Sequence, residues 1–156
     1  MLDNYERKHD VKKVWRRQNG EYVLVDEPYT EYWDLEKRRS VAAGLADSDF
    51  ISYIALNDGK AVGFISLKKQ LAGCRMILDQ MQISAECRRS GLGRRLFVIA
   101  KEEAVKAGAS ELYISACSSE ETIAFYRAMG AEITDDPIAE IADDEPFDLQ
   151  MVCKVR

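Results

Sequence analysis

Histidine is almost absent from this chain of 156 residues, in which His9 is the only one. The four cysteines, Cys74, Cys87, Cys117 and Cys153, are scattered and form no C-x-x-C pair. Protein zinc sites use cysteine and histidine ligands at short, regular spacings, so the sequence predicts no metal site. We expect the cysteines to be reduced thiols that are mostly buried or partly buried.

Long apolar runs are missing as well, so we expect no membrane-spanning helix and no membrane partner. The N-terminal sequence MLDNYERKHD is charged and has no apolar segment behind it. This pattern argues against a signal peptide and favours the cytoplasm. The chain also lacks linkers, internal repeats and low-complexity tracts, and we therefore expect a single domain over residues 1–156.

Positive charge is in deficit overall, because the net charge of the chain is −5. We expect no nucleic-acid partner for such an acidic protein. Arginines nevertheless gather in one short stretch, at Arg88, Arg89, Arg94 and Arg95. A local cationic site on an acidic protein suits a small polyanionic ligand better than a long polyanion.

These arginines flank a turn that contains two glycines. Residues 76–106 are typical of an apolar strand, then the turn RRSGLG at Arg88–Gly93, then an amphipathic helix. Glycines at a helix start let the backbone approach a ligand, and the first N–H groups of a helix attract anions such as phosphate. The same pattern also fits a plain strand–helix connection with solvated arginines. It is not a P-loop, because no Gly-Lys-Ser/Thr follows, and Leu96 stands where a Rossmann fingerprint has its third glycine.

Hydrophobic periodicity and turn residues predict the elements around this stretch. Before it, we expect a hairpin over 11–25, a helix over 34–45, a hairpin over 50–67 and a loop over 66–73. We expect a strand over 76–84, buried on both faces, before the helix and a strand over 111–116 after it. This strand–helix–strand order predicts that the two strands are parallel neighbours in a βαβ unit. After it, we expect a helix capped by Ser118 and Glu121 and ending at Gly130, a polar loop over 135–145 and a closing strand over 148–155.

The order of these pieces resembles the GNAT superfamily of N-acetyltransferases. Arg88–Gly93 matches the family's acetyl-CoA motif, Gln/Arg-x-x-Gly-x-Gly/Ala, and Val62-Gly63-Phe64 resembles the family's third strand. Residues 112–116 and 123–130 resemble the family's second half, and residues 145–150 are similar to the ending of an uncharacterised bacterial branch. The resemblance covers the chain well from residue 50 onward and only loosely before it.

The resemblance implies an α/β (α+β) fold of the acyl-CoA N-acyltransferase type. Its mixed central sheet is splayed between the parallel strands 76–84 and 111–116 and flanked by helices. Acetyl-CoA would enter the split, with its pyrophosphate on the turn and its pantetheine arm paired with the main chain like an added strand. The implied cofactor-binding residues are Met81, Ile83, Arg88, Arg89, Ser90, Gly91, Leu92, Gly93, Arg94 and Ser119. Ser119 stands where many members have an asparagine that contacts the pantetheine arm.

The implied reaction is direct transfer of an acetyl group from acetyl-CoA to a primary amine of a small molecule or peptide. Tyr126 matches the family's general acid, which lies next to the departing sulfur. The alternative for this side chain is a core tyrosine packed beside Phe125.

The general base is less clearly marked. The positions where family members often carry a glutamate are apolar here, at Ile77 and Ile114. Asp79 has the same strand parity as Ile77 and is the carboxylate best placed to replace it. The alternatives are a structural role for Asp79, and a water chain that ends on Ser115 or Gln82.

Two other functions fit the same turn. The missing glutamates leave room for a non-catalytic module that binds or senses acyl-CoA, and the turn could also serve another nucleotide or phosphate. Acidic residues within 135–145 hint at a cationic acceptor, although a solvated acidic loop explains them as well. The chain is expected to be a monomer or a homodimer, since an exposed closing strand could pair with a second copy.

Overall fold

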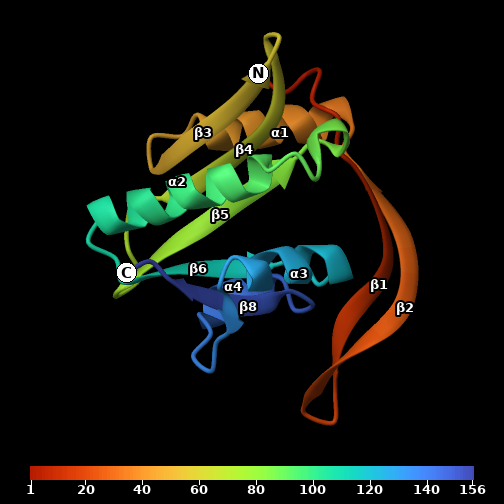
Figure 1. Cartoon of the computed structure of the whole chain (residues 1–156), viewed down its shortest axis with the longest axis vertical. Coiled ribbons are helices and arrows are strands. Elements are labelled where there is room, and N and C mark those ends of the chain that lie inside the picture. The colour runs from red at the N-terminus through yellow and green to blue at the C-terminus, as the bar shows by residue number, and fades with distance from the viewer.

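The computed structural model describes residues 1–156 and is built around a six-stranded mixed sheet (Figure 1). The strand order is β3-β4-β5-β6-β8-β7. These strands are β3 (Phe50–Asn57), β4 (Lys60–Lys68), β5 (Arg75–Ile83), β6 (Glu111–Ala116), β7 (Glu132–Ile133) and β8 (Leu149–Lys154). The long strands β1 (Lys8–Gln18) and β2 (Glu21–Tyr32) form a separate antiparallel hairpin. The α/β class inferred from the sequence is therefore confirmed.

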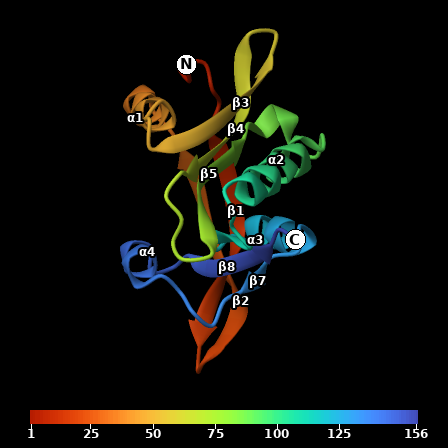
Figure 2. The ribbon, with the colours of Figure 1, turned by 90° about the vertical axis from the view of Figure 1, so that its left-hand side faces the viewer.

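Helices cover both faces of the sheet. They are α1 (Leu35–Leu45), α2 (Leu92–Lys106), α3 (Glu120–Ala128) and α4 (Ala139–Asp144), with a short 3-10 helix at Ala85–Cys87. Figure 2 shows α2 and α3 on one side of the sheet and α1 and α4 on the other. The main core lies between the sheet and α2 and α3, whereas a smaller aromatic core joins the N-terminus and α1 to β4.

The central sheet is split between β5 and β6. These strands pair in parallel only from Arg75 with Glu111 to Leu78 with Ile114, and beyond that point they separate. On its other edge β5 pairs with β4, where the register steps from Leu78 to Gln80 and leaves Asp79 as a bulge. The predicted splay is therefore confirmed, and we call the opening between residues 79–83 and 115–117 the V.

The β1–β2 hairpin crosses the mouth of the V. The N–H of Trp15 donates to the carbonyl of Ser118 at 2.8 Å, just before α3. Nearer the start of β1, the guanidinium of Arg88 donates to the carbonyl of Lys8 at 3.0 Å. The hairpin is thus attached to both halves of the split sheet and is longer than the predicted 11–25 hairpin.

Two expected loops are corrected by the structure. The segment 135–145 is not a continuous loop, because it contains α4 between Pro137 and Pro146 and follows the short strand β7. The N–H of Ile138 donates to the hydroxyl of Tyr113 at 3.0 Å, which fixes the start of α4 on the sheet. The loop after β4 starts later than expected, since β4 runs to Lys68.

The cap of α3 and the burial of β5 also differ from expectation. The N-cap is Ser119 and not Ser118, because the Ser118 hydroxyl already accepts from Arg16 at 2.6 Å. Strand β5 is fully buried only at Met76 and Leu78, since the V leaves its second half open to solvent.

Candidate active site

The turn before α2 presents a row of free backbone donors. The N–H groups of Arg89, Ser90, Gly91, Gly93 and Arg94 donate to no acceptor in the chain. Arg89 has φ 62 and Gly91 has φ 85, so two residues of the turn adopt the left-handed conformation. Successive N–H groups in such a turn converge into an anion-binding concavity. The turn at the start of α2 therefore has the backbone geometry that suits an anion, and its binding role stays a prediction.

The two glycines of this turn have different roles. A Cβ added to Gly91 would meet no atom within 4 Å, so this glycine borders open space, and its positive φ also favours glycine. A Cβ added to Gly93 would lie 3.0 Å from Cε1 of Phe125, so this glycine lets α2 pack closely against α3. Leu92 packs in turn against the sheet, because Gly63 on β4 leaves room for its side chain.

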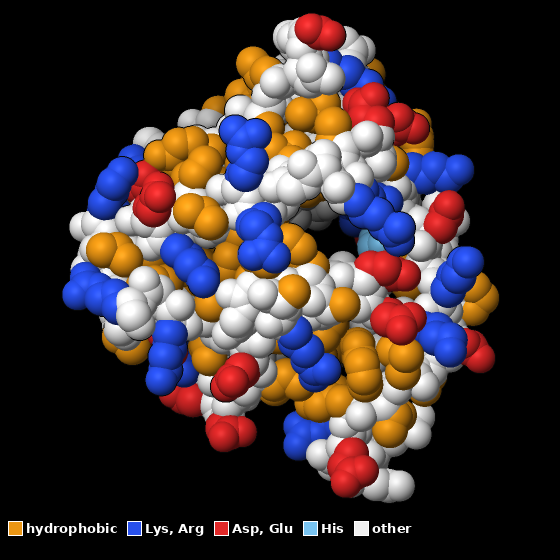
Figure 3. Space-filling model, viewed as in Figure 1, with side chains coloured by type: hydrophobic (Ala, Val, Ile, Leu, Met, Phe, Trp, Pro, Cys, Tyr) orange, Lys and Arg blue, Asp and Glu red, His pale blue; other side chains and the backbone are white.

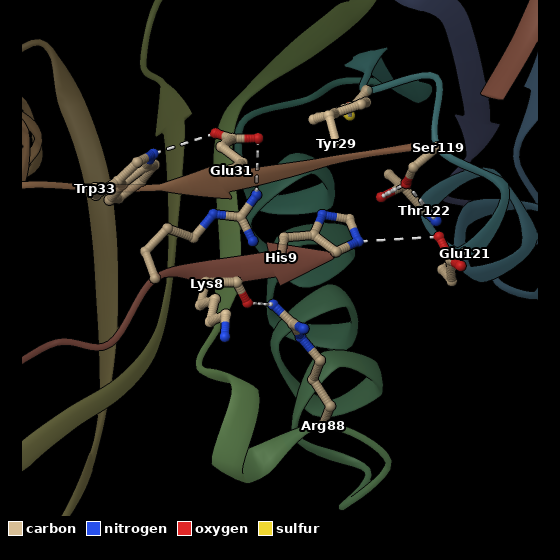
Figure 4. Close-up of polar contacts among 11 residues, drawn as sticks. Lys8, His9, Tyr29, Glu31, Trp33, Arg88, Ser119, Glu121 and Thr122 are labelled. Atoms are coloured by element: carbon tan, nitrogen blue, oxygen red, sulfur yellow. Dashed lines mark hydrogen bonds and ion pairs between the residues drawn. The ribbon is translucent and has the colours of Figure 1, made fainter. Parts of the chain in front are cut away.

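The arginines of the turn also have different roles, because one is bonded within the chain and two are not. Arg88 reaches back to β1, where Figure 4 shows its guanidinium at the Lys8 carbonyl. Arg89 and Arg94 make no hydrogen bond or salt bridge within the chain, so they remain available to an anion at the turn. Figure 3 shows Lys or Arg side chains beside an opening in the surface, with acidic side chains next to them on its rim.

The edge of β5 that faces the V can accept an added strand. The N–H of Ser84 donates to Val62 on β4 at 2.8 Å. Because bonding direction alternates along a strand, Gln82 and Gln80 also point their main chain at β4, and Met81 and Ile83 point theirs into the V. The residues predicted to pair with a pantetheine arm are thus the ones whose main chain faces the opening.

Tyr126 lies on α3 at the other wall of the V. Its side chain is nearly buried and packs against Phe97 and Phe125, with ring centroids 6.1 Å and 5.4 Å away. The hydroxyl forms no hydrogen bond within the chain. Burial, with smaller contributions from Cys117 and Asp148, raises the pKa of this phenol above its ordinary value, so it is protonated at neutral pH.

Asp79 projects from the bulge where β5 leaves β6. Its side chain forms no hydrogen bond or salt bridge in the chain. Loss of water on one side raises the pKa of this carboxyl, and the charge of Lys68 opposes that rise. The bulge puts the backbone of Asp79 where the V begins, but the residue is exposed and near Lys68, and the bulge breaks the strand parity that it was expected to share with Ile77. Its catalytic role stays a prediction.

Ser119 has a structural task in the cap of α3. Its hydroxyl accepts from the N–H of Thr122 at 3.2 Å and bonds the Thr122 hydroxyl at 2.7 Å (Figure 4). The residue has no exposed surface. Its predicted contact with the pantetheine arm stays a prediction, and the cap explains the side chain as it stands.

A second carboxylate near the V was missed by the sequence reasoning. Asp148, just before β8, accepts from the Ser115 hydroxyl on β6 at 2.9 Å. Burial raises the pKa of this carboxyl to about 6, with Glu145 and Glu31 adding to the rise and the Ser115 bond opposing it. Asp148 follows a Pro-Phe pair in an otherwise acidic segment, so no periodicity marked it out. The one sequence feature that pointed toward this carboxylate was its partner Ser115, which was predicted as an end of a water chain.

Two general features bear on the kind of site. No three histidine, cysteine or acidic side chains gather closely enough to hold a metal ion. None of the helices is both long enough and apolar enough to cross a bilayer.

The fold matches solved acetyltransferase structures along nearly the whole chain. Nourseothricin acetyltransferase aligns with a TM-score of 0.76 and 20% identity over 99% of this chain and 91% of that one. A protein assigned as a streptothricin acetyltransferase from Bacillus anthracis str. Ames, in complex with acetyl coenzyme A, aligns at 0.71 and 19% over 99% and 89%. An aminoglycoside 6'-N-acetyltransferase complexed with coenzyme A aligns at 0.61 and 16% over 80% and 82%.

Sequence comparison gives the family. No curated protein sequence matches this one. The model of the acetyltransferase (GNAT) family matches residues 11–131, a span that holds the turn, the V and Tyr126. This chain therefore belongs to the acetyltransferase (GNAT) family.

Proposed function

We propose that the protein transfers the acetyl group of acetyl-CoA directly to a primary amine of a small molecule or peptide. The observation that carries the proposal is the row of free N–H groups between Arg89 and Arg94, at the mouth of a V whose β5 edge is unpaired. These features fit the two ends of one long ligand, a pyrophosphate and an amide-bearing arm.

Acetyl-CoA would be held by main-chain groups at both places. Its pyrophosphate would accept from the turn, with Arg89 and Arg94 supplying charge-assisted bonds. Its arm would pair with the main chain of Met81 and Ile83 as an added strand does. Solved neighbours hold acetyl coenzyme A or coenzyme A, which supports this donor.

Tyr126 would act as the general acid. Attack by the amine nitrogen on the thioester carbonyl forms a C–N bond, and collapse breaks the C–S bond and releases a thiolate. A protonated phenol beside the sulfur can donate its proton to that thiolate. The Tyr126 hydroxyl is free to do so, because it has no partner within the chain.

The test measures thiol release from acetyl-CoA against a panel of amines. The panel contains polyamines, amino acids, N-terminal peptides, streptothricin and aminoglycosides, because the neighbours include acetyltransferases with the last two in their names. We expect release that depends on both substrates. Tight CoA binding without turnover for any amine would instead mark the protein as an acyl-CoA-binding module.

The role of the acid is tested by Tyr126→Phe. We expect kcat to fall by about 100-fold, with CoA affinity unchanged, because general acid catalysis contributes on the order of 10²–10⁴. Tyr53→Phe is the matched control, since it removes a hydroxyl bonded to Glu103 on the outer surface. Equal activity of the two variants would remove Tyr126 from the mechanism.

A further inference from the structure

A cavity of about 730 Å³ lies beside the V, between the tip of the β1–β2 hairpin and the segment from β7 to β8. Rings of Trp15, Tyr22 and Phe147 line it, together with the carboxyls of Asp135 and Asp148. A volume of this size holds a drug-sized molecule. The cavity is therefore large enough for a substrate and has both apolar and acidic walls.

Two arginines also line the cavity, and their charges are partly committed. Arg16 pairs with Glu27 and stacks on Phe147, with its guanidinium carbon 4.5 Å from the ring centroid. Arg17 lies 5.9 Å from the centroid of Tyr22 and has no carboxylate partner. The two carboxyls thus face one unpaired cation, which leaves a net negative wall for a cationic ligand.

Asp148 is held at the inner wall by a chain of hydrogen bonds. The amide of Gln150 donates to the Ser115 hydroxyl at 2.9 Å, so that hydroxyl directs its own proton to Oδ2 of Asp148, also at 2.9 Å. The hydroxyl of Tyr113 donates to Gln150, which fixes the amide orientation. Only Oδ2 is engaged in this way, and Oδ1 of Asp148 has no partner in the chain.

Asp148 and Tyr126 lie on opposite faces of the sheet. Ser115 and Gln150 are cross-strand neighbours on β6 and β8, on the face away from α2 and α3. Tyr126 packs on α2 and α3 at the other face. The two side chains are still close enough for the charge of Asp148 to raise the pKa of Tyr126. Asp148 and Tyr126 thus flank the V from its two sides.

We propose that this cavity binds the acceptor, a cationic primary amine with an apolar body, and that Oδ1 of Asp148 takes a proton from its nitrogen. This inference rests on the proposed function and names the acceptor site and base for it. The bound ammonium first loses one proton to Asp148, which passes it to solvent water, and the neutral amine then attacks the thioester carbonyl. As the C–N bond forms, a second N–H proton passes to Asp148. The C–S electrons leave on sulfur, which takes the Tyr126 proton. Water then returns the second proton from Asp148 to Tyr126, so the products are the amide, free CoA and one proton released to solvent.

The pH profile distinguishes a base from a mere contact. Burial is the main cause of the pKa of about 6 at Asp148, the charges of Glu145 and Glu31 raise it further, and the charge of Asp148 in turn raises the pKa of Tyr126. A base must be deprotonated to work, so kcat/KM is expected to fall below about pH 6. Loss of this fall in Asp148→Asn would assign it to Asp148 and not to Asp79, the other carboxyl near the V whose pKa burial raises.

The experiment compares Asp148→Asn with Asp143→Asn, an equal change on an exposed side chain of α4 outside the cavity. For the amine that the wild type acetylates best, we expect Asp148→Asn to lower kcat/KM by about 100-fold and to lose the acid limb near pH 6. The amide oxygen that replaces the carboxylate can still accept from Ser115, and CoA affinity serves as the control for folding. Full activity with an unchanged limb would overturn the base role while leaving the proposed function intact.

A second measurement does not depend on turnover. The carboxyl resonance of Asp148 is followed by ¹³C NMR with tyramine, spermidine and kanamycin as probes. An ammonium beside Oδ1 should lower the pKa of Asp148, which is read from the pH dependence of its carboxyl resonance. The Asp143→Asn variant should show the same lowering of the Asp148 pKa. No shift with any probe would overturn the amine site. A shift without acetylation would keep the amine site and overturn the proposed function together with the base.

Discussion

The two sides of the V are made from different parts of the chain. On the donor side, the anion site is a row of main-chain N–H groups within Arg89–Arg94. On the acceptor side, the cavity is lined by side chains from β1, β2, β8 and the segment around α4. The first site is local and depends on backbone conformation, whereas the second is assembled from distant segments. A short motif can therefore mark the proposed donor site, whereas only the fold reveals the proposed acceptor site.

The largest expected effect tests the donor side. Gly91→Trp fills the open space at the turn, and we expect CoA affinity to fall at least about 100-fold, or roughly 3 kcal/mol, by calorimetry. Gly108→Trp is the matched control, because Gly108 has a similar positive φ and open space at the other end of α2. Both variants carry similar backbone strain, and only Gly91→Trp should lose CoA. Equal affinity in both would show that the turn is only structural.

The second prediction separates the two glycines of the turn. Gly93→Ala places a methyl group against Phe125 and should lower the free energy of unfolding by about 1–3 kcal/mol in urea denaturation. Phe125→Leu should relieve part of that loss, so the double variant is expected to be more stable than the sum of the single changes predicts. Strict additivity would contradict close packing of α2 on α3 as the reason for Gly93.

A third prediction tests the acceptor side through stability. The pKa of Asp148 is about 6 in the folded chain and about 4 when unfolded, so the folded state binds more protons between these values. The free energy of unfolding therefore falls as pH rises from about 4 through 6. Asp148→Asn removes the cost of holding an ionised carboxylate in a partly buried site. This variant should therefore be more stable than wild type by about 1 kcal/mol at pH 7.5, after allowance for solvent screening.

Urea denaturation at pH 7.5 and pH 5 measures this difference, which should shrink at the lower pH. Asp143→Asn controls for the loss of one acidic charge and should show no such change between the two pH values. A gap between wild type and Asp148→Asn that is constant with pH would mean that the carboxyl titrates normally.

The smallest expected effect concerns Ser119. Loss of the cap in Ser119→Ala should lower the free energy of unfolding by about 1 kcal/mol. Ser48→Ala is the control, because Ser48 is exposed and its hydroxyl makes no hydrogen bond within the chain. CoA affinity measured on the same variants decides whether Ser119 also contacts the pantetheine arm, since only that role would weaken binding beyond the control.

The sequence predicts the parts of the site that depend on local chemistry. Gly91 and the arginines predict an anion-binding turn, and the βαβ order predicts the parallel pair. The resemblance to the family adds that this pair splits. Asp148 could not be predicted in this way, because its environment comes from Ser115 on β6 and from side chains far away along the chain. The predicted cap of α3 was wrong by one residue for a similar reason, since Arg16, from a distant strand, donates to the Ser118 hydroxyl.

The attachment of the hairpin to α3 has a consequence for how the chain folds. The bond between Arg16 and Ser118 joins residues that are 102 positions apart. Contacts of such long separation carry a large loop-closure cost, and they form late when the segments between them can fold first. The split sheet, with its local βαβ unit, can therefore assemble before the hairpin closes over it. Conversely, the hairpin can detach in a partial unfolding step that leaves the sheet intact, and amide exchange at Trp15 would report that step ahead of global unfolding.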